Sequence, residues 1–123
     1  MSSDIAVKEI NGGLAIPKGT RAVPISHQYL DQDGNPVDLT SGTWTGQGRA
    51  EQLHETTQPP NIGDGSVGIN IPTATATYEW VDEDFETIGR FRLIIWIGNG
   101  TQRFGSTVYE WNVADAPGAD PTV

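Results

Sequence analysis

The stretch from Ile88 to Val113 constrains the fold of this chain more than any other, because it reads as two strands joined by a tight reversal. Apolar side chains alternate with other residues up to Gly98, an Asn99-Gly100 pair follows, and the alternation then resumes. An Asn-Gly pair tolerates the positive φ angles of a hairpin turn, and period-two alternation is typical of a strand with one buried face. The stretch therefore predicts a β-hairpin whose inward side chains are Phe91, Leu93, Ile95, Ile97, Thr107, Tyr109, Trp111 and Val113.

The length and composition favour a single all-β domain. A chain of 123 residues can bury one core, and its 15 Gly and 8 Pro residues favour short strands separated by many turns. No stretch of useful length has helical periodicity, and the sequence has no internal repeat. We therefore predict a sandwich or a barrel.

The charge of the chain narrows the choice of partners. Seven Lys and Arg residues oppose sixteen Asp and Glu residues, which gives a formal net charge of −9. Such a chain repels a phosphate backbone, so we expect no nucleic-acid partner. The absence of Cys excludes disulfides and thiolate metal sites. No apolar segment approaches the roughly 18 residues of a membrane span and no signal peptide is recognised, so we expect neither a membrane partner nor export.

The chain divides into three parts by pattern. Residues 1–19 hold a short alternating piece followed by Gly12-Gly13, and we expect either an edge strand or an arm that docks on a neighbour and orders only there. Residues 20–114 are predicted to form the β-sandwich, and residues 115–123 a disordered tail. The apolar side chains of the N-terminal piece, which are candidate interface residues, are Ile5, Val7 and Ile10.

Five carboxylates crowd into one turn between Glu79 and Glu86. A glycosidase pair would need two carboxylates across a cleft, with one desolvated, and a single polar turn does not favour that arrangement. The alternatives are a solvated turn, or a contact with a basic partner surface or an opportunistic cation. For the second alternative, the candidate interface residues are Asp82, Glu83 and Asp84.

Four Trp residues raise the possibility of a sugar-stacking surface. Trp80 and Trp111 share their faces with other apolar residues and are predicted to be core. Trp96 differs, because it lies with Ile94 on the face opposite the inward residues of the hairpin. We expect Ile94 and Trp96 to be covered by a neighbouring strand, the N-terminal arm or another subunit.

The remaining constellations give no catalytic, cofactor or metal site. The run from Asp31 to Asn35 resembles a calcium loop, but the Gly and Glu positions of such a loop fall on Pro36 and Gly42. A hairpin turn whose Asp and Asn side chains bond their own backbone is the better interpretation. Neither His27 nor His54 has companions spaced as in a catalytic triad. We therefore predict a protein that is not an enzyme and needs no cofactor.

The order of several short motifs resembles the N-terminal immunoglobulin-like domain of bacteriophage baseplate upper proteins and similar small virion proteins. The first half is Pro17-Lys18-Gly19-Thr20 followed by the stretch from Leu30 to Gly42, which reads LDQDGNPVDLTSG. The second half is Tyr78-Glu79-Trp80, Asp84, Gly89-Arg90-Phe91 and the strand from Tyr109 to Val113. The resemblance spans about residues 17–114 and implies an immunoglobulin-like antiparallel β-sandwich of about seven to eight strands.

Two departures from the family pattern stand out. Phe91 lacks the hydroxyl of a tyrosine corner, so the corner must be held otherwise. Baseplate upper proteins also carry long C-terminal regions that this sequence does not show, which leaves a capsid decoration, connector or tail protein open.

The resemblance implies a non-enzymatic virion structural protein, made in the host cytoplasm, that docks as a homo-oligomer or in multiple copies on other virion proteins of a capsid or tail lattice. The alternative is a carbohydrate-binding module that recognises host glycans. Neighbouring genes would separate the two, because the first predicts capsid and tail genes and the second glycoside hydrolases.

Overall fold

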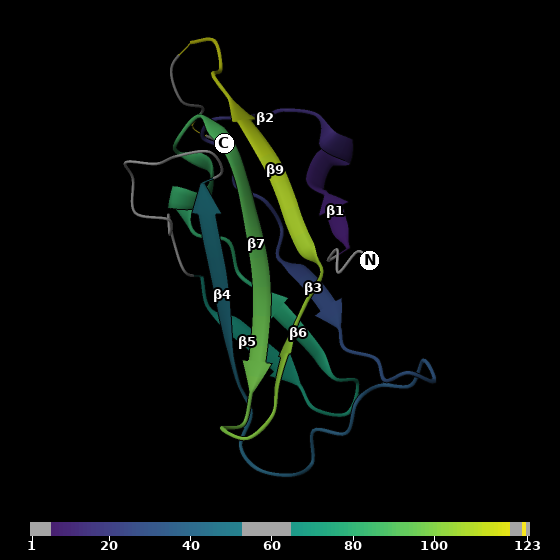
Figure 1. Cartoon of the computed structure of the whole chain (residues 1–123). Helices are drawn as coiled ribbons and strands as arrows, with labels where there is room; N and C mark the ends of the chain where they lie inside the picture. The colour runs from purple at the N-terminus through teal and green to yellow at the C-terminus, as the bar shows by residue number, and fades with distance from the viewer. Residues whose placement is uncertain (1–5, 53–64, 119–121, 123) are drawn as a thin grey trace.

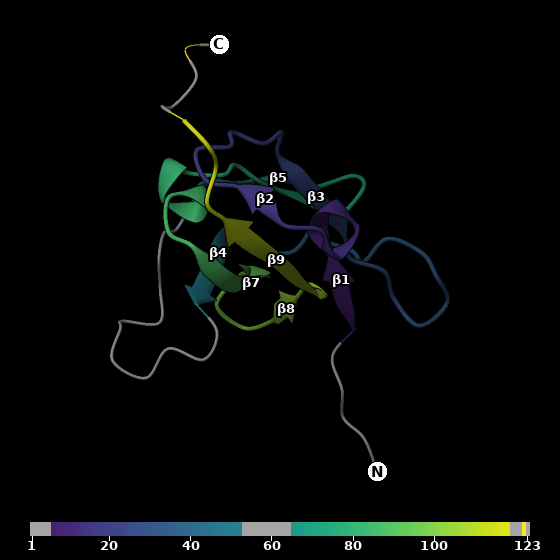
Figure 2. The same ribbon diagram turned by 90° about the horizontal axis from the view of Figure 1, so that it is seen from above.

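A computed structural model describes residues 6–52, 65–118 and 122 of the chain. The described strands form two sheets that pack face to face as a β-sandwich, and the prediction of an all-β fold is confirmed (Figures 1 and 2). Nine strands are described, slightly more than predicted, because the N-terminal piece supplies short strands and the hairpin contains an extra one. Only two short 3₁₀ helices, η1 (Ile10–Gly13) and η2 (Asp82–Phe85), interrupt the strands of this described part.

The larger sheet is built around the predicted hairpin. Its central strands run in the order β1-β9-β7-β4, with β2 also on β9 and β8 also on β7. Pairing is antiparallel except that the two N-terminal strands run parallel to β9. The strands are β1 (Val7–Glu9), β2 (Ile16–Pro17), β4 (Thr45–Gln52), β7 (Gly89–Gly98), β8 (Arg103–Gly105) and β9 (Val108–Ala114).

The smaller sheet is antiparallel and has the order β3-β6-β5. Its strands are β3 (Ile25–Gln28), β5 (Val67–Asn70) and β6 (Thr75–Tyr78). In the immunoglobulin fold, the second, fifth and fourth strands lie together opposite a sheet made from the third, sixth and seventh. The order β3-β6-β5 opposite β4-β7-β9 has this connectivity, and β1 and β2 extend the second sheet beyond its last strand.

The core lies between the sheets and contains the apolar side chains predicted from the hairpin alternation, whereas Thr107 precedes β9 and is only half-buried. Phe91, Leu93, Ile95 and Ile97 are at most 1% exposed, and Trp111 and Val113 from β9 are buried as deeply. The smaller sheet contributes Tyr78 and Ala76. Trp80 is half-buried at the rim of this core, where its ring meets Trp111 edge-on at 5.0 Å between centroids.

Glycines in β4 admit large side chains from the opposite sheet. A Cβ atom at Gly48 would lie 2.2 Å from Cε1 of Tyr78, and one at Gly46 would lie 2.4 Å from Cγ1 of Val67. The ring of Tyr78 fills the room that Gly48 leaves. The side chains of Tyr78 and Val67 therefore pack directly on the backbone of β4.

Val23 departs from the predicted pattern. Period-two alternation along the sequence would place Val23 on one face with Ile25, His27 and Tyr29, yet Val23 is 81% exposed, whereas Tyr29 is 4% exposed. The described strand begins only at Ile25, after Pro24, so Val23 is not held against the core by a β-ladder. Its backbone carbonyl instead accepts a hydrogen bond from Nε1 of Trp80.

Candidate binding surface on the larger sheet

The outer face of the larger sheet gathers most of the basic side chains of the protein. We call it the arginine face and define it by the side chains of Arg49, Arg90, Arg92, Ile94, Trp96 and Arg103. These residues alternate with the buried ones along β4, β7 and β8. Four of the seven Lys and Arg residues of the chain therefore lie on one face of a molecule whose formal charge is −9.

Ion pairs cross the strands at one half of the arginine face. Arg90 donates from Nη2 to Glu110 at 2.6 Å and to Glu9 at 2.7 Å, so it joins β7 to β9 and β1. Arg92 pairs with Glu51 on β4. Hydrogen bonds to the Glu110 and Glu9 carboxylates raise the pKa of Arg90, so this guanidinium keeps its charge. Charges of opposite sign thus offset one another across the face, and the exposed pairs contribute little to stability.

Ile94 and Trp96 lie half-buried between this charged row and the tip of the hairpin. They were expected to be covered by a neighbouring strand, the N-terminal arm or another subunit. The strand β8 provides part of this cover, because the Trp96 ring packs on Gly105, where a Cβ would be only 2.9 Å from Cζ3. Arg103 of the same strand places its guanidinium carbon 5.8 Å from the ring centroid.

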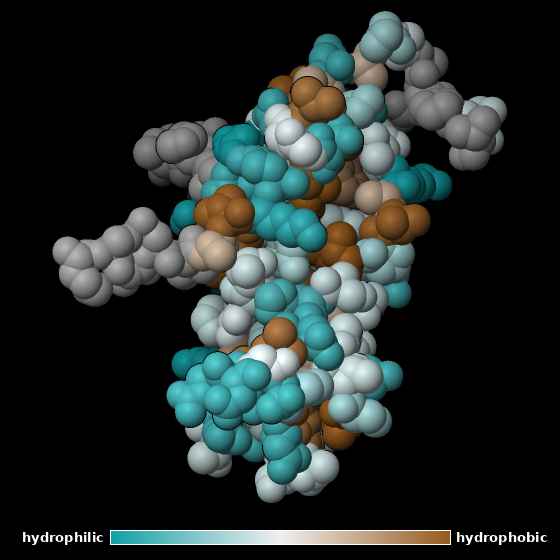
Figure 3. Space-filling model, turned by 90° about the vertical axis from the view of Figure 1, so that its right-hand side faces the viewer, coloured by the Kyte–Doolittle hydropathy of each residue, from teal (hydrophilic) through white to brown (hydrophobic). Residues whose placement is uncertain are grey.

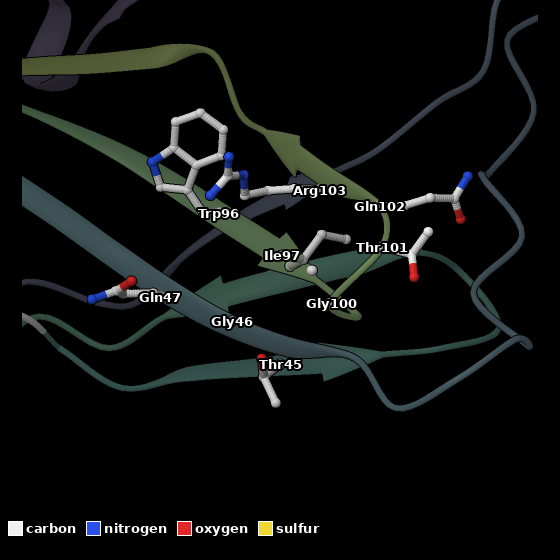
Figure 4. Close-up of a pocket in the computed structure, with 10 residues that line it drawn as sticks. Thr45, Gly46, Gln47, Trp96, Ile97, Gly100, Thr101, Gln102 and Arg103 are labelled. Carbon is white, nitrogen blue, oxygen red and sulfur yellow. The ribbon is translucent and has the colours of Figure 1, made fainter.

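A pocket of about 690 Å³ opens beside Trp96 at the hairpin end of this face (Figure 4). Strands β4 and β7 and the turn before β8 supply its walls. Figure 4 shows the Trp96 ring and the Arg103 side chain close together, with Gln47 extending from β4 and Thr101 and Gln102 at the turn. The lining residues are Thr45, Gly46, Gln47, Trp96, Ile97, Gly98, Gly100, Thr101, Gln102 and Arg103.

The expectation for Asp84 is wrong. Asp84 was a candidate for a solvated interface turn, but it is fully buried. Its Oδ2 accepts hydrogen bonds from the Val81 N–H at 2.9 Å and the Tyr78 hydroxyl at 3.0 Å, and this closes η2 against the core. The sequence shows five carboxylates close together in one turn, but it does not show which of them is buried by a hydrogen bond to Tyr78.

The other acidic candidates remain untested as interface residues. The backbone of Asp82 and Glu83 forms the first half of η2, and their side chains lie outside the described part of the structure. Glu79 and Glu86, at the two ends of the same turn, are exposed.

The three N-terminal candidate residues differ in their surroundings. Val7 is in β1 and is 52% exposed, while Ile10 in η1 is half-buried against the core. Ile5 lies outside the described residues. Because β1 and β2 pair with β9 of the same molecule, the structure takes the edge-strand alternative for residues 7–17 rather than that of a separate arm.

Sequence reasoning missed Arg103 and Gln47 as neighbours of Trp96. Both depend on register, because Trp96 pairs with Gln47 on β4 and with Gly105 on β8. The hairpin turn itself is the signal that could have found Arg103. Gly98 and Arg103 are the residues that pair directly across the turn that contains Asn99-Gly100.

Within the described residues, no three His, Cys, Asp or Glu side chains come together in a way that could hold a metal ion. Among the helices described, none is long and apolar enough to cross a membrane. The carboxylate of Asp31 accepts hydrogen bonds from the backbone N–H groups of Asp33 and Asn35, as predicted for a turn rather than a calcium loop.

No protein-family model matches this sequence, and a comparison with curated proteins finds no significant match.

Proposed function

We propose that this protein is a non-enzymatic structural component of a bacteriophage virion, which docks in multiple copies on a capsid or tail lattice. It is a capsid decoration protein, a connector, or a component of the tail or baseplate. The resemblance of the motif order to that of baseplate upper proteins supports the proposal, and so does the immunoglobulin-like strand order.

The observation that carries the proposal is the uncovered arginine face. An Ile and a Trp lie at its centre, with cross-strand ion pairs beside them, on a sheet that the described chain leaves open on its outer side. An apolar centre bordered by charges is the composition of a protein contact surface. By contrast, Figure 3 shows hydrophobic residues scattered in separate spots over the side of the molecule that it displays.

The occupant of this face in the proposal is a lattice protein of the virion. A second copy of the chain is a poorer occupant, because the molecule is acidic overall and two copies repel one another. The acidic turn around η2 would meet a basic patch on the same lattice protein, since charge pairing of this kind guides association.

The test is reattachment to particles that lack the protein. Particles from a phage with the gene deleted are mixed with purified protein and sedimented, and the bound fraction is measured. The double variant Arg92→Glu with Ile94→Asp is expected to bind at least roughly tenfold more weakly, because it replaces one of the two central apolar side chains by a charge and reverses a second charge. The variant Thr77→Glu, on the outer face of the smaller sheet, is the matched control.

The outcomes are distinct. Wild-type protein that does not sediment with such particles at any salt concentration contradicts the proposal. Binding that is lost equally with Thr77→Glu contradicts the assignment to the arginine face. Circular dichroism of each variant shows whether it has folded.

A further inference from the structure

We propose that the pocket beside Trp96 binds a saccharide unit that carries a carboxylate. This inference does not depend on the virion role, and its test uses the isolated protein. The pocket lies at the hairpin end of the arginine face, and the variants of the docking test change none of the residues that line it.

Strand register builds the pocket. One cross-strand row on the outer face runs from Thr45 through Gly98 to Arg103, and the next runs from Gln47 through Trp96 to Gly105. In the first row the middle residue has no side chain, and in the second the middle residue is the largest available. The backbone of Gly98 is therefore a floor, Trp96 is an end wall, and β4 and β8 supply the two sides.

Contacts from β8 hold the indole wall in place. Trp96 leans over β8 because Gly105 has no side chain to exclude its six-membered ring. The Arg103 guanidinium lies within cation–π distance of the same ring. Trp96 belongs to the outer face and not to the buried face of β7, so packing of the sandwich core does not account for an aromatic residue there.

The chemistry of the lining selects the ligand class. An aromatic wall suits the apolar C–H face of a sugar ring, and the amide of Gln47 and the hydroxyls of Thr45 and Thr101 suit its hydroxyl groups. Arg103 is the only charged side chain among the described residues that line the pocket, in a chain with sixteen acidic residues. A guanidinium beside an aromatic wall favours a carboxylate on the sugar, because charge-assisted hydrogen bonds are the strongest a pocket of this kind can offer.

The size of the pocket agrees with this class. A volume of about 690 Å³ is within the range of small-molecule sites and accommodates one or two sugar units.

The experiment compares glucuronate with glucose, which share a ring and differ at the carboxylate. Each sugar is titrated into ¹⁵N-labelled protein, and the four indole N–H signals are followed by NMR. The Trp96 signal is identified from its loss in Trp96→Phe. We expect glucuronate to shift this signal and to bind roughly tenfold more tightly than glucose, the difference that one charge-assisted contact makes.

Variants separate the two parts of the site. Trp96→Ala is expected to abolish the response to both sugars. Arg103→Gln leaves the indole in place and is expected to reduce glucuronate binding to the level of glucose, while Arg103→Lys retains part of the preference. Thr77→Ala, on the smaller sheet, is the control and is expected to bind as wild type.

Three results would overturn the inference. They are equal binding of glucuronate and glucose, shifts that leave the Trp96 signal unmoved, and glucuronate binding that survives Arg103→Gln unchanged. Failure of this test leaves particle attachment unaffected, so the two proposals can fail separately.

Discussion

At the scale of single residues, Asp84 replaces a contact that other immunoglobulin-like domains make with a tyrosine corner. Phe91 occupies the place of that tyrosine and has no hydroxyl. Asp84 instead accepts hydrogen bonds from the Val81 N–H and the Tyr78 hydroxyl, and its own backbone carbonyl accepts one from Nε1 of Trp111 at 3.0 Å. Asp84 therefore joins η2 to the last residue of β6 through its carboxylate and to β9 through its backbone carbonyl.

We predict that Asp84→Ala lowers the free energy of unfolding by about 3 kcal/mol, because the buried Tyr78 hydroxyl and the partly buried Val81 N–H lose their acceptor. Asp84→Asn should cost less, since its amide oxygen still accepts. Urea denaturation measures both, with Glu86→Gln as the exposed control, which is expected to stay within about 0.5 kcal/mol of wild type. A loss of similar size in Glu86→Gln would show that charge in the turn, not burial, is responsible.

His27 gives the protein a specific pH dependence. Burial lowers the pKa of His27 below its ordinary value of 6.5, so the unfolded chain binds this proton more readily than the folded protein. The stability that the neutral ring contributes is complete above pH 6.5 and is lost as the pH falls through the folded-state pKa. His27→Asn, which can still reach the Tyr109 hydroxyl, should therefore lose less stability than wild type between pH 7.5 and about 5. Parallel melting curves across this range for the two proteins would refute the assignment.

Residue-level prediction from the sequence succeeded where alternation alone decides burial. Phe91, Leu93 and Ile95 are inward because side chains on one strand alternate between faces. It failed where burial depends on a distant partner. Asp84 is desolvated by packing in three dimensions, and the surroundings of Trp96 depend on the register of two other strands.

At the scale of elements, the N-terminal strands are part of the sandwich. Strand β1 pairs with residues 108–110 of β9, and β2 pairs with residues 113–114. All three residues of β1 are exposed, whereas Ile16 in β2 is 6% exposed and belongs to the core. The sequence could not distinguish this arrangement from an arm on a neighbour, because a short alternating piece can add to any open strand edge.

We predict that deleting residues 1–9 costs about 1 kcal/mol, since it removes a short exposed ladder and the Arg90–Glu9 pair. Deleting residues 1–17 should cost at least about 2 kcal/mol more, because Ile16 leaves the core. Thermal melting of the two truncated chains compares them. Equal melting temperatures for both deletions and wild type would show that the whole segment is an arm that does not stabilise the domain.

The contact between Gly48 of β4 and Tyr78 of β6 leads to a second prediction at this scale. Gly48→Ala should destabilise the domain by roughly 2 kcal/mol, because its Cβ would overlap the Tyr78 ring. Gly68→Ala on β5 is the matched control, since a Cβ there meets nothing within 4 Å. Chemical denaturation of the two variants tests the difference, and a stable Gly48→Ala would mean that the sheets separate readily.

At the scale of the whole molecule, charge is distributed unevenly. The arginine face holds four of the seven basic residues, so only three basic residues lie elsewhere in a chain with sixteen acidic residues. Like charges repel within one compact molecule, and salt screens that repulsion.

We therefore predict that raising NaCl from about 20 to about 200 mM at pH 7.5 increases the melting temperature by roughly 3 °C. The increase should shrink near pH 4.3, the isoelectric point, where net charge is small. Differential scanning calorimetry provides the measurement. A melting temperature that falls with salt at pH 7.5 would show that the ion pairs of the arginine face outweigh the general repulsion.

The parallel pairing of β1 and β2 with β9 also determines when these strands can fold during synthesis. The first strands of the sandwich rest against its last one, and β9 is held on its other side by β7. During synthesis, β1 and β2 emerge long before their partner exists and stay without a ladder until β9 leaves the ribosome. Contacts between segments so far apart in sequence slow folding. The nascent chain therefore exposes open strand edges for most of its synthesis, and final closure is an event that follows translation of β9.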